Sequence, residues 1–223
     1  MRALTTIREE LKEAAGSTGR LVDDIALMAV SKTQSYERIL QLYQQGQRLF
    51  GENRVQEATK KFPAQRPEGM KVHLIGHLQS NKAKAALKVF DQIDSVDSLK
   101  LARILEKHLT HPYPILLQLK TSDEESKYGF ENEDELLRAL EEIASYTNLT
   151  VRGIMSIGPL TSNRELTLKA FAQTRNLFLR AKELFPEMNL DTLSMGMSGD
   201  FPLAIAEGST MVRIGTRIFG ERG

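Results

Sequence analysis

The feature that most constrains this chain is an alternation of short apolar runs with longer segments of helical period. Short apolar runs without polar alternation are typical of parallel strands buried on both faces, and parallel neighbours require a crossover helix between them. Eight segments of the chain are candidates for such strands. The predicted strands are Ile25–Ser31, Arg48–Phe50, Lys71–Ile75, Gln92–Ser95, Pro114–Leu119, Thr150–Met155, Thr192–Ser194 and Met211–Ile214.

Amphipathic helices are predicted between the strands. Near-helical spacing is followed by two sets of apolar residues: Leu99, Ala102, Leu105 and Leu109, and Leu166, Ala170, Leu177 and Ala181. An additional helix over residues 3–15 precedes the first strand. Eight consecutive β/α units predict a single (β/α)₈ TIM barrel domain over residues 1–223. An open, doubly wound sheet is the alternative, and strands two and seven are the shortest of the eight.

Composition narrows the chemistry and the partners. The 223 residues include 30 basic and 29 acidic side chains and no cysteine. We therefore expect no nucleic-acid or membrane partner, no disulfide framework and no thiolate metal site. The four histidines lack the spacing of a metal-ligand set, so no metal is expected. Without an apolar segment of leader or membrane-spanning length, the expected location is the cytoplasm.

Lys32 directly follows the first apolar run, where a barrel places its active groups. Burial lowers the pKa of a lysine, and the neutral amine is the nucleophile that Schiff-base chemistry needs. A lysine that ends a strand and simply reaches solvent fits the same position. Position alone therefore leaves both interpretations open.

The loops after the seventh and eighth strands favour an anion site. Barrels commonly bind phosphate there, and both loops are small and contain glycine. The first contains Gly196 and Ser198, and the second contains Gly215 and Thr216. A helix predicted to begin near Asp200–Leu203, with Pro202 in its first turn, would direct further N–H groups toward the anion. Two ordinary tight turns would have the same composition.

Arg213 interrupts the apolar run of the eighth strand. A buried charge needs a partner. One possible partner is the ring nitrogen of pyridoxal 5′-phosphate (PLP), because arginine is one of the residues found opposite that atom. The other is a carboxylate such as Glu52 or Glu207, in a structural salt bridge.

Several motifs, in order along nearly the whole chain, resemble one known family. They are the segments 29–33 (AVSKT), 50–57 (FGENRVQE), 73–82 (HLIGHLQSNK), 193–198 (LSMGMS) and 208–216 (GSTMVRIGT). Together they resemble the YggS/PROSC family of PLP homeostasis proteins, whose barrel is similar to the N-terminal domain of alanine racemase.

The resemblance assigns a role to each candidate residue. Lys32 would be the Schiff-base lysine, and Arg213 would face the pyridine nitrogen. Phosphate would be bound by Ser198, Gly215 and Thr216, and the pocket would be lined by Asn53, His77 and Met195. The family implies PLP and amino-acid homeostasis without robust catalysis, with PLP-requiring apo-enzymes or amino acids as further partners.

The resemblance also bears on turnover and assembly. Alanine racemase takes a second base from a partner's C-terminal domain, whereas this chain ends at Gly223. We therefore expect a monomer that holds PLP rather than a racemase. A PLP-dependent racemase or lyase is the alternative, and it would need a second acid or base such as His77 or Lys127.

Three positions depart from the family pattern, namely Leu49, Lys120 and Gly199. All three lie near strand ends, around the expected mouth of the barrel. They are compatible with natural drift. They are also compatible with an engineered pocket in which the amine of Lys120 or Lys32 acts on carbonyl substrates without PLP.

Overall fold

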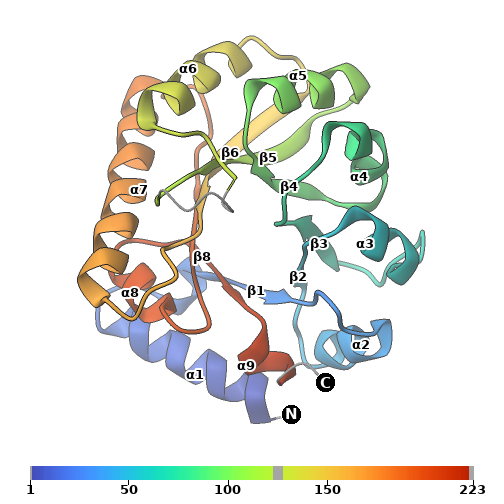
Figure 1. Ribbon diagram of the computed structural model, residues 1–223. Coiled ribbons are helices and arrows are strands. Elements are labelled where there is room, and N and C mark those ends of the chain that lie inside the picture. The colour runs from blue at the N-terminus through green and yellow to red at the C-terminus, as the bar shows by residue number, and fades with distance from the viewer. Residues whose placement is uncertain (1, 123–127, 221–223) are drawn as a thin grey trace.

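The eight predicted strands form a closed parallel barrel. The computed structural model describes residues 2–122 and 128–220, and each strand in it pairs with its neighbour in chain order. The last strand pairs with the first, with Ala26 opposite Met211 and Ala29 opposite Ile214. This pairing closes the sheet (Figure 1), so the predicted barrel is confirmed and the open-sheet alternative is wrong.

The strands agree with their predicted positions to within a few residues. Their bounds are β1 Ala26–Val30, β2 Leu49–Glu52, β3 Lys71–Leu74, β4 Gln92–Val96, β5 Tyr113–Leu119, β6 Leu149–Ser156, β7 Thr192–Met197 and β8 Met211–Ile214. The predicted strands two and seven are both present, and each extends further toward its carboxyl end than the apolar run alone indicates.

Helices surround the barrel (Figure 1). The α-helices are α1 Arg2–Gly16, α2 Tyr36–Gln44, α3 Val55–Lys61, α4 Ala83–Val89, α5 Leu99–His108, α6 Glu133–Ile143, α7 Arg164–Leu184, α8 Phe201–Ala206 and α9 Thr216–Phe219, with 3₁₀ turns η1 Val22–Asp24 and η2 Ser80–Lys82. No helix among the described residues is long and apolar enough to cross a membrane.

Two of the helix predictions can be compared with the packing. Ala170, Leu177 and Ala181 are buried along α7, but Leu166 at its first turn is 50% exposed. The helical period therefore identifies the buried face of α7 but extends it one turn too far. α8 begins at Phe201, with Pro202 in its first turn as predicted.

Side-chain alternation divides the barrel wall into two faces. Residues such as Val212 and Ile214 of β8 belong to the hydrophobic core shared with the helices. Because successive side chains of a strand point to opposite faces, Arg213 between them faces the barrel interior. The same parity directs Met28, His73 and Asp94 inward, and all of these side chains are buried. The interior thus carries buried polar and charged groups, among them Arg213, His73 and Asp94.

Candidate functional site

Lys32 lies two residues beyond β1 and shares a small cleft with the loop after β8. The cleft is lined by Val30, Lys32, Thr33 and Gln34 from the first loop and by Gly215, Thr216, Phe219 and Gly220 from the other. A side chain at position 215 would be in contact with Val30, because a Cβ there would lie 3.4 Å from the Cβ and the carbonyl oxygen of Val30. Position 215 therefore lies directly against Val30, in the cleft that also contains Lys32.

The two predicted anion loops lie together. The Thr216 hydroxyl donates to Ser198 Oγ at 3.4 Å, so a side-chain contact links the loop after β8 to the loop after β7. The carboxylate of Asp200 accepts from the backbone N–H of Met197 at 2.6 Å, which closes the β7 loop into a turn. Ser198, Gly215 and Thr216 can therefore face a common ligand, together with Lys32, whose cleft includes two of them.

Arg213 is buried in the barrel interior without a carboxylate partner among the described residues. Its guanidinium donates to Ser194 Oγ at 2.6 Å and to the backbone oxygen of Ser156 at 2.7 Å. Burial lowers the pKa of Arg213 to about 10, against a weaker opposing effect of the carboxylates of Asp94 and Asp200. The group remains a cation at neutral pH.

The salt-bridge interpretation of Arg213 is wrong for both nominated carboxylates. Glu52 pairs with Lys61 at 2.8 Å, and Glu207 pairs with Arg175 at 3.0 Å. Glu52 belongs to the outward-facing set of β2, because Gly51 before it faces the interior toward Met28. Strand parity therefore separates Glu52 from Arg213.

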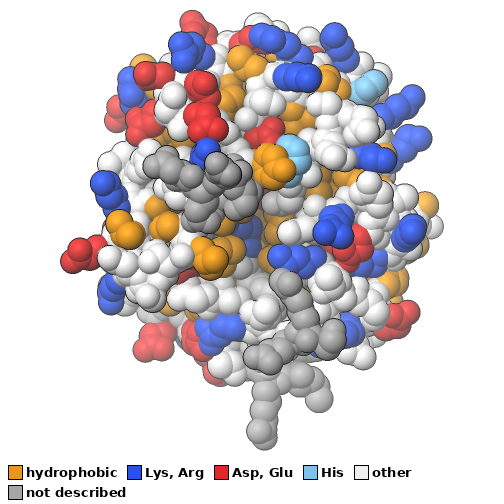
Figure 2. Space-filling view, viewed as in Figure 1, with side chains coloured by type: hydrophobic (Ala, Val, Ile, Leu, Met, Phe, Trp, Pro, Cys, Tyr) orange, Lys and Arg blue, Asp and Glu red, His pale blue; other side chains and the backbone are white. Residues whose placement is uncertain are grey.

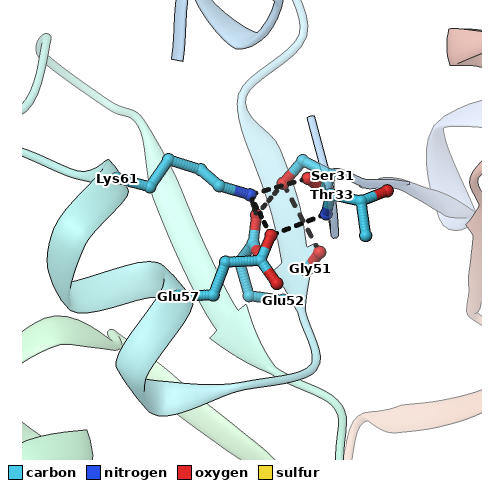
Figure 3. Close-up of polar contacts among 6 residues, drawn as sticks. All are labelled: Ser31, Thr33, Gly51, Glu52, Glu57 and Lys61. Atoms are coloured by element: carbon cyan, nitrogen blue, oxygen red, sulfur yellow. Dashed lines mark hydrogen bonds and ion pairs between the residues drawn. The ribbon is translucent and has the colours of Figure 1, made fainter. Parts of the chain in front are cut away.

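A buried polar network holds the backbone on both sides of Lys32 (Figure 3). Lys61 extends from the end of α3 and donates to the backbone oxygen of Ser31 and to the carboxylates of Glu52 and Glu57, each at 2.8 Å. Ser31 also donates to Glu52 at 2.6 Å. An ammonium group has three donors, and all three are used here. Lys61 is thereby excluded as a competing amine nucleophile.

Thr33 is the one residue in the described chain, apart from glycines, with a positive φ, at 64°. A β-branched residue in this left-handed region is strained. Its backbone N–H donates to the Glu57 carboxylate at 2.6 Å, so the strained turn is stabilised by a charge-assisted hydrogen bond. The turn that follows Lys32 is therefore held in place by α3.

The two carboxylates of the network respond oppositely to their surroundings. Burial raises the pKa of Glu52, although hydrogen bonds from Lys61 and Ser31 counteract it, and its Oε2 is buried without a hydrogen-bond partner. Burial also acts upward on Glu57, but the bonds from Lys61 and Thr33 outweigh it, so the pKa of Glu57 is lowered. Glu57 is thus the stably ionised member of the pair.

The remaining predicted residues lie in different places. Asn53 is half-buried after β2, and its backbone contacts the β3 loop so closely that a Cβ at Gly76 would lie 2.2 Å from its carbonyl oxygen. His77 is exposed and lines a separate, wider cleft. Met195 is fully buried in the helix-facing core, because Ser194 before it faces the interior. Met195 therefore does not line the mouth of the barrel.

The second lysine of the mouth has a partner, and one nominated residue is not described. Lys120 forms an ion pair with Glu131 at 3.0 Å. Lys127 lies outside the described residues. Among those that are described, no group of acidic and histidine side chains is arranged to hold a metal ion.

Sequence reasoning missed the Lys61 network. Glu57 and Lys61 are four residues apart on α3, a spacing that places two side chains on one helix face. That signal was available, but the same spacing is common on solvent-exposed faces. The close approach of α3 to the end of β1 is what distinguishes this pair, and it appears only in the folded chain.

Comparison with known proteins gives consistent matches along the chain. The family model described as "Alanine racemase, N-terminal domain" matches residues 4–223. A pyridoxal phosphate homeostasis protein of Haemophilus influenzae is 41% identical over 224 residues, which cover 98% of this chain and 94% of that protein. The Escherichia coli protein of the same name is 39% identical over 227 residues, covering 98% and 95%.

Solved structures give the same picture. PipY of Synechococcus elongatus with PLP bound aligns with a TM-score of 0.81 and 38% identity, over 94% of this chain and all (100%) of that chain. An alanine racemase of Corynebacterium glutamicum aligns with a TM-score of 0.70 over 99% of this chain and 60% of that one. At 18% identity, the second likeness concerns the fold alone.

Proposed function

The chain belongs to the alanine racemase N-terminal domain family and, within it, to the pyridoxal phosphate homeostasis proteins, and from this membership we propose that it holds PLP on Lys32 at the mouth of the barrel. The observation that carries the proposal is the cleft shared by Lys32, Gly215 and Thr216. The cleft places an amine beside loops with the composition of a phosphate site.

The residues present fit such a cofactor. Hydroxyl groups of Ser198 and Thr216 and the backbone of Gly215 would bind the phosphate. Arg213 supplies a cation that forms no direct ion pair with a carboxylate in the described part of the chain. It would donate to the ring nitrogen and, because arginine does not readily release a proton, would leave that nitrogen unprotonated.

When bound, PLP supplies an aldehyde that links covalently to an amine and a ring that withdraws electrons. An arginine opposite the ring nitrogen makes that withdrawal weak, which favours storage over turnover. Lys32 would hold the cofactor, and the Lys61 network would fix the turn that carries Lys32. We therefore assign to the chain a role in PLP homeostasis, with release to PLP-requiring apo-enzymes.

An absorbance spectrum tests the proposal. The chain incubated with PLP and freed of excess should absorb in the near-violet, and borohydride should abolish the band. Lys32→Ala should lose it, whereas Lys120→Ala, the matched removal of the other lysine at a strand end, should retain it. A protein that takes up no PLP, or a Lys32→Ala variant with the unaltered spectrum, would refute the proposal.

A further inference from the structure

A second, larger cleft lies beside the loops that follow β2 and β3. It encloses about 920 Å³. Its walls are formed by α3 with the residue before it, by the segment between β3 and α4, and by Tyr128 from the connection between β5 and α6. The charged and aromatic side chains among the lining residues are Arg54, Glu57, Lys60, His77, Lys82 and Tyr128. Clefts of this volume accommodate small organic ligands. Neither Lys32 nor any of Ser198, Gly215 and Thr216 lines this cleft, so it is distinct from the Lys32 site.

The cleft carries an excess of positive charge. Glu57 and Lys60 lie three residues apart on α3, Arg54 immediately precedes this helix, and Lys82 comes from η2. In the part of the chain that the structure describes, none of the three cations forms an ion pair. Figure 2 shows Lys and Arg side chains gathered over α3, with an acidic side chain among them.

The single carboxylate among these residues is already engaged. Glu57 accepts hydrogen bonds from Lys61 and from the backbone of Thr33. It therefore forms its ion pair with Lys61, although its charge also acts on Arg54; among the described residues, Lys60 and Lys82 have no carboxylate partner in the cleft. The cleft is left with three donors suited to an anion with several oxygen atoms, for which a phosphate group is the natural match.

One wall of the cleft is a pair of stacked rings. His77 and Tyr128 lie with ring centroids 3.6 Å apart and planes inclined by 11°. His77 is oriented by a 2.7 Å contact between its Nδ1 and the carboxylate of Asp97. Tyr128 is 52% exposed, a high degree for an aromatic side chain. A flat aromatic wall beside cations is suited to a ligand that combines a planar ring with phosphate.

We propose that this cleft is a second, non-covalent binding site for a phosphate-bearing aromatic small molecule. The phosphate is held by Arg54, Lys60 and Lys82, and the ring packs on the His77–Tyr128 pair. The choice of a phosphorylated pyridine as the ligand rests on the proposed function. A site of this kind, close to Lys32, would bind an incoming or departing phosphorylated pyridine while Lys32 is occupied.

A titration of the loaded protein tests this site. The full chain is saturated with PLP and reduced with borohydride, so that the Lys32 site is blocked, and pyridoxamine 5′-phosphate is then titrated by calorimetry. We expect one binding event, with inorganic phosphate a weaker competitor and pyridoxamine without phosphate weaker still. The near-violet band before reduction reports separately on the Lys32 site.

Charge reversals locate the site. Lys60→Glu combined with Lys82→Glu should weaken the binding of pyridoxamine 5′-phosphate by at least roughly tenfold. Lys84→Glu combined with Lys88→Glu, on the exposed face of α4, changes the net charge equally and should leave it unaltered. If the first pair unfolds the chain, Lys60→Gln with Lys82→Gln replaces it. Tyr128→Ala should weaken pyridoxamine 5′-phosphate but not inorganic phosphate.

Three results would overturn the proposal: no binding to the reduced protein, equal effects of the two double variants, or inorganic phosphate binding as tightly as pyridoxamine 5′-phosphate. If the chain takes up no PLP at Lys32, the proposed function fails on its own. The same titration is then made with the unloaded Lys32→Ala chain, with and without the Lys60 and Lys82 reversals. It shows whether the cleft binds pyridoxamine 5′-phosphate.

Discussion

Two buried cations lie near the carboxyl ends of the strands, and they differ in the acceptors that surround them. Lys61 has an 8% exposed side chain and donates to two carboxylates and a carbonyl oxygen. Arg213 is equally buried inside the barrel, but its described partners are the neutral oxygens of Ser194 and Ser156. One cation is fully neutralised within the fold, and the other is not.

The difference separates a structural role from a binding role. A buried charge without a counter-ion is energetically costly, and such groups concentrate where a ligand completes their surroundings. Lys61 needs nothing more, because every ammonium proton has an acceptor. Arg213 has donors to offer and no carboxylate to occupy them in the described chain. Lys61 thus supports the turn that carries Lys32, and Arg213 is the cation that we propose faces the ligand.

The largest effect on stability is expected when Lys61 is removed. Lys61→Met would leave the carboxylate of Glu52 buried and unpaired, and breaking a buried ion pair costs about 3–5 kcal/mol. Chemical denaturation measures the loss. Lys60→Met, an exposed neighbour on the same helix, should change stability by less than about 0.5 kcal/mol. Equal losses of stability in the two variants would contradict a structural role for Lys61.

Removal of Arg213 should cost less stability and more ligand. Arg213→Met leaves two buried oxygens without their donor, at about 1–3 kcal/mol. PLP retention, followed by absorbance during dialysis, should fall by roughly tenfold or more, because the ring nitrogen loses its donor. Arg213→Lys keeps the charge and should retain more PLP than Arg213→Met. Full retention by Arg213→Met would contradict the assignment of a binding role.

Glu57→Gln tests whether the network holds the turn after Lys32. The variant weakens a charge-assisted bond to the Thr33 N–H, and we expect a loss of about 1–2 kcal/mol near neutral pH. Because the pKa of Glu57 is lowered, its contribution is present above the ordinary value of 4.5 and is lost as the pH falls through the lower folded-state value. The stability difference between the unaltered chain and the variant should therefore shrink on acidification. A difference independent of pH would argue against this bond.

The smallest expected effect comes from the strained residue itself. Thr33→Asn places a residue that tolerates positive φ where threonine does not, and should stabilise the chain by about 0.5–1 kcal/mol. Thermal unfolding measures the gain. Thr33→Val retains the β-branch and should show no gain. If both variants behave alike, the positive φ is not a source of strain.

The barrel and the positions of the two loops after β7 and β8 could be predicted from the sequence, because they depend on local patterns. Apolar runs mark β1 to β8, and small residues such as Gly215 and Thr216 follow the last strand. The helix-facing position of Met195 could also be predicted, because successive side chains of a strand point to opposite faces and Ser194 points to the interior.

Other features depend on contacts between segments far apart in the chain. Which oxygen atoms reach Arg213 is decided by barrel closure, which brings β6 and β7 to it. The wide cleft forms only where α3, η2 and Tyr128 meet, and these are separated by up to 74 positions, from Arg54 to Tyr128. No local sequence pattern predicts that these segments come into contact. Lys61 was missed for the same reason.

The most direct test of the account is to locate the covalently held cofactor. The full chain is incubated with PLP, reduced with borohydride, digested with a protease and mapped by mass spectrometry. We predict a single major pyridoxyl group on the peptide that contains Lys32. A major label on Lys61, Lys120 or another lysine, or no label at all, would contradict the assignment of Lys32.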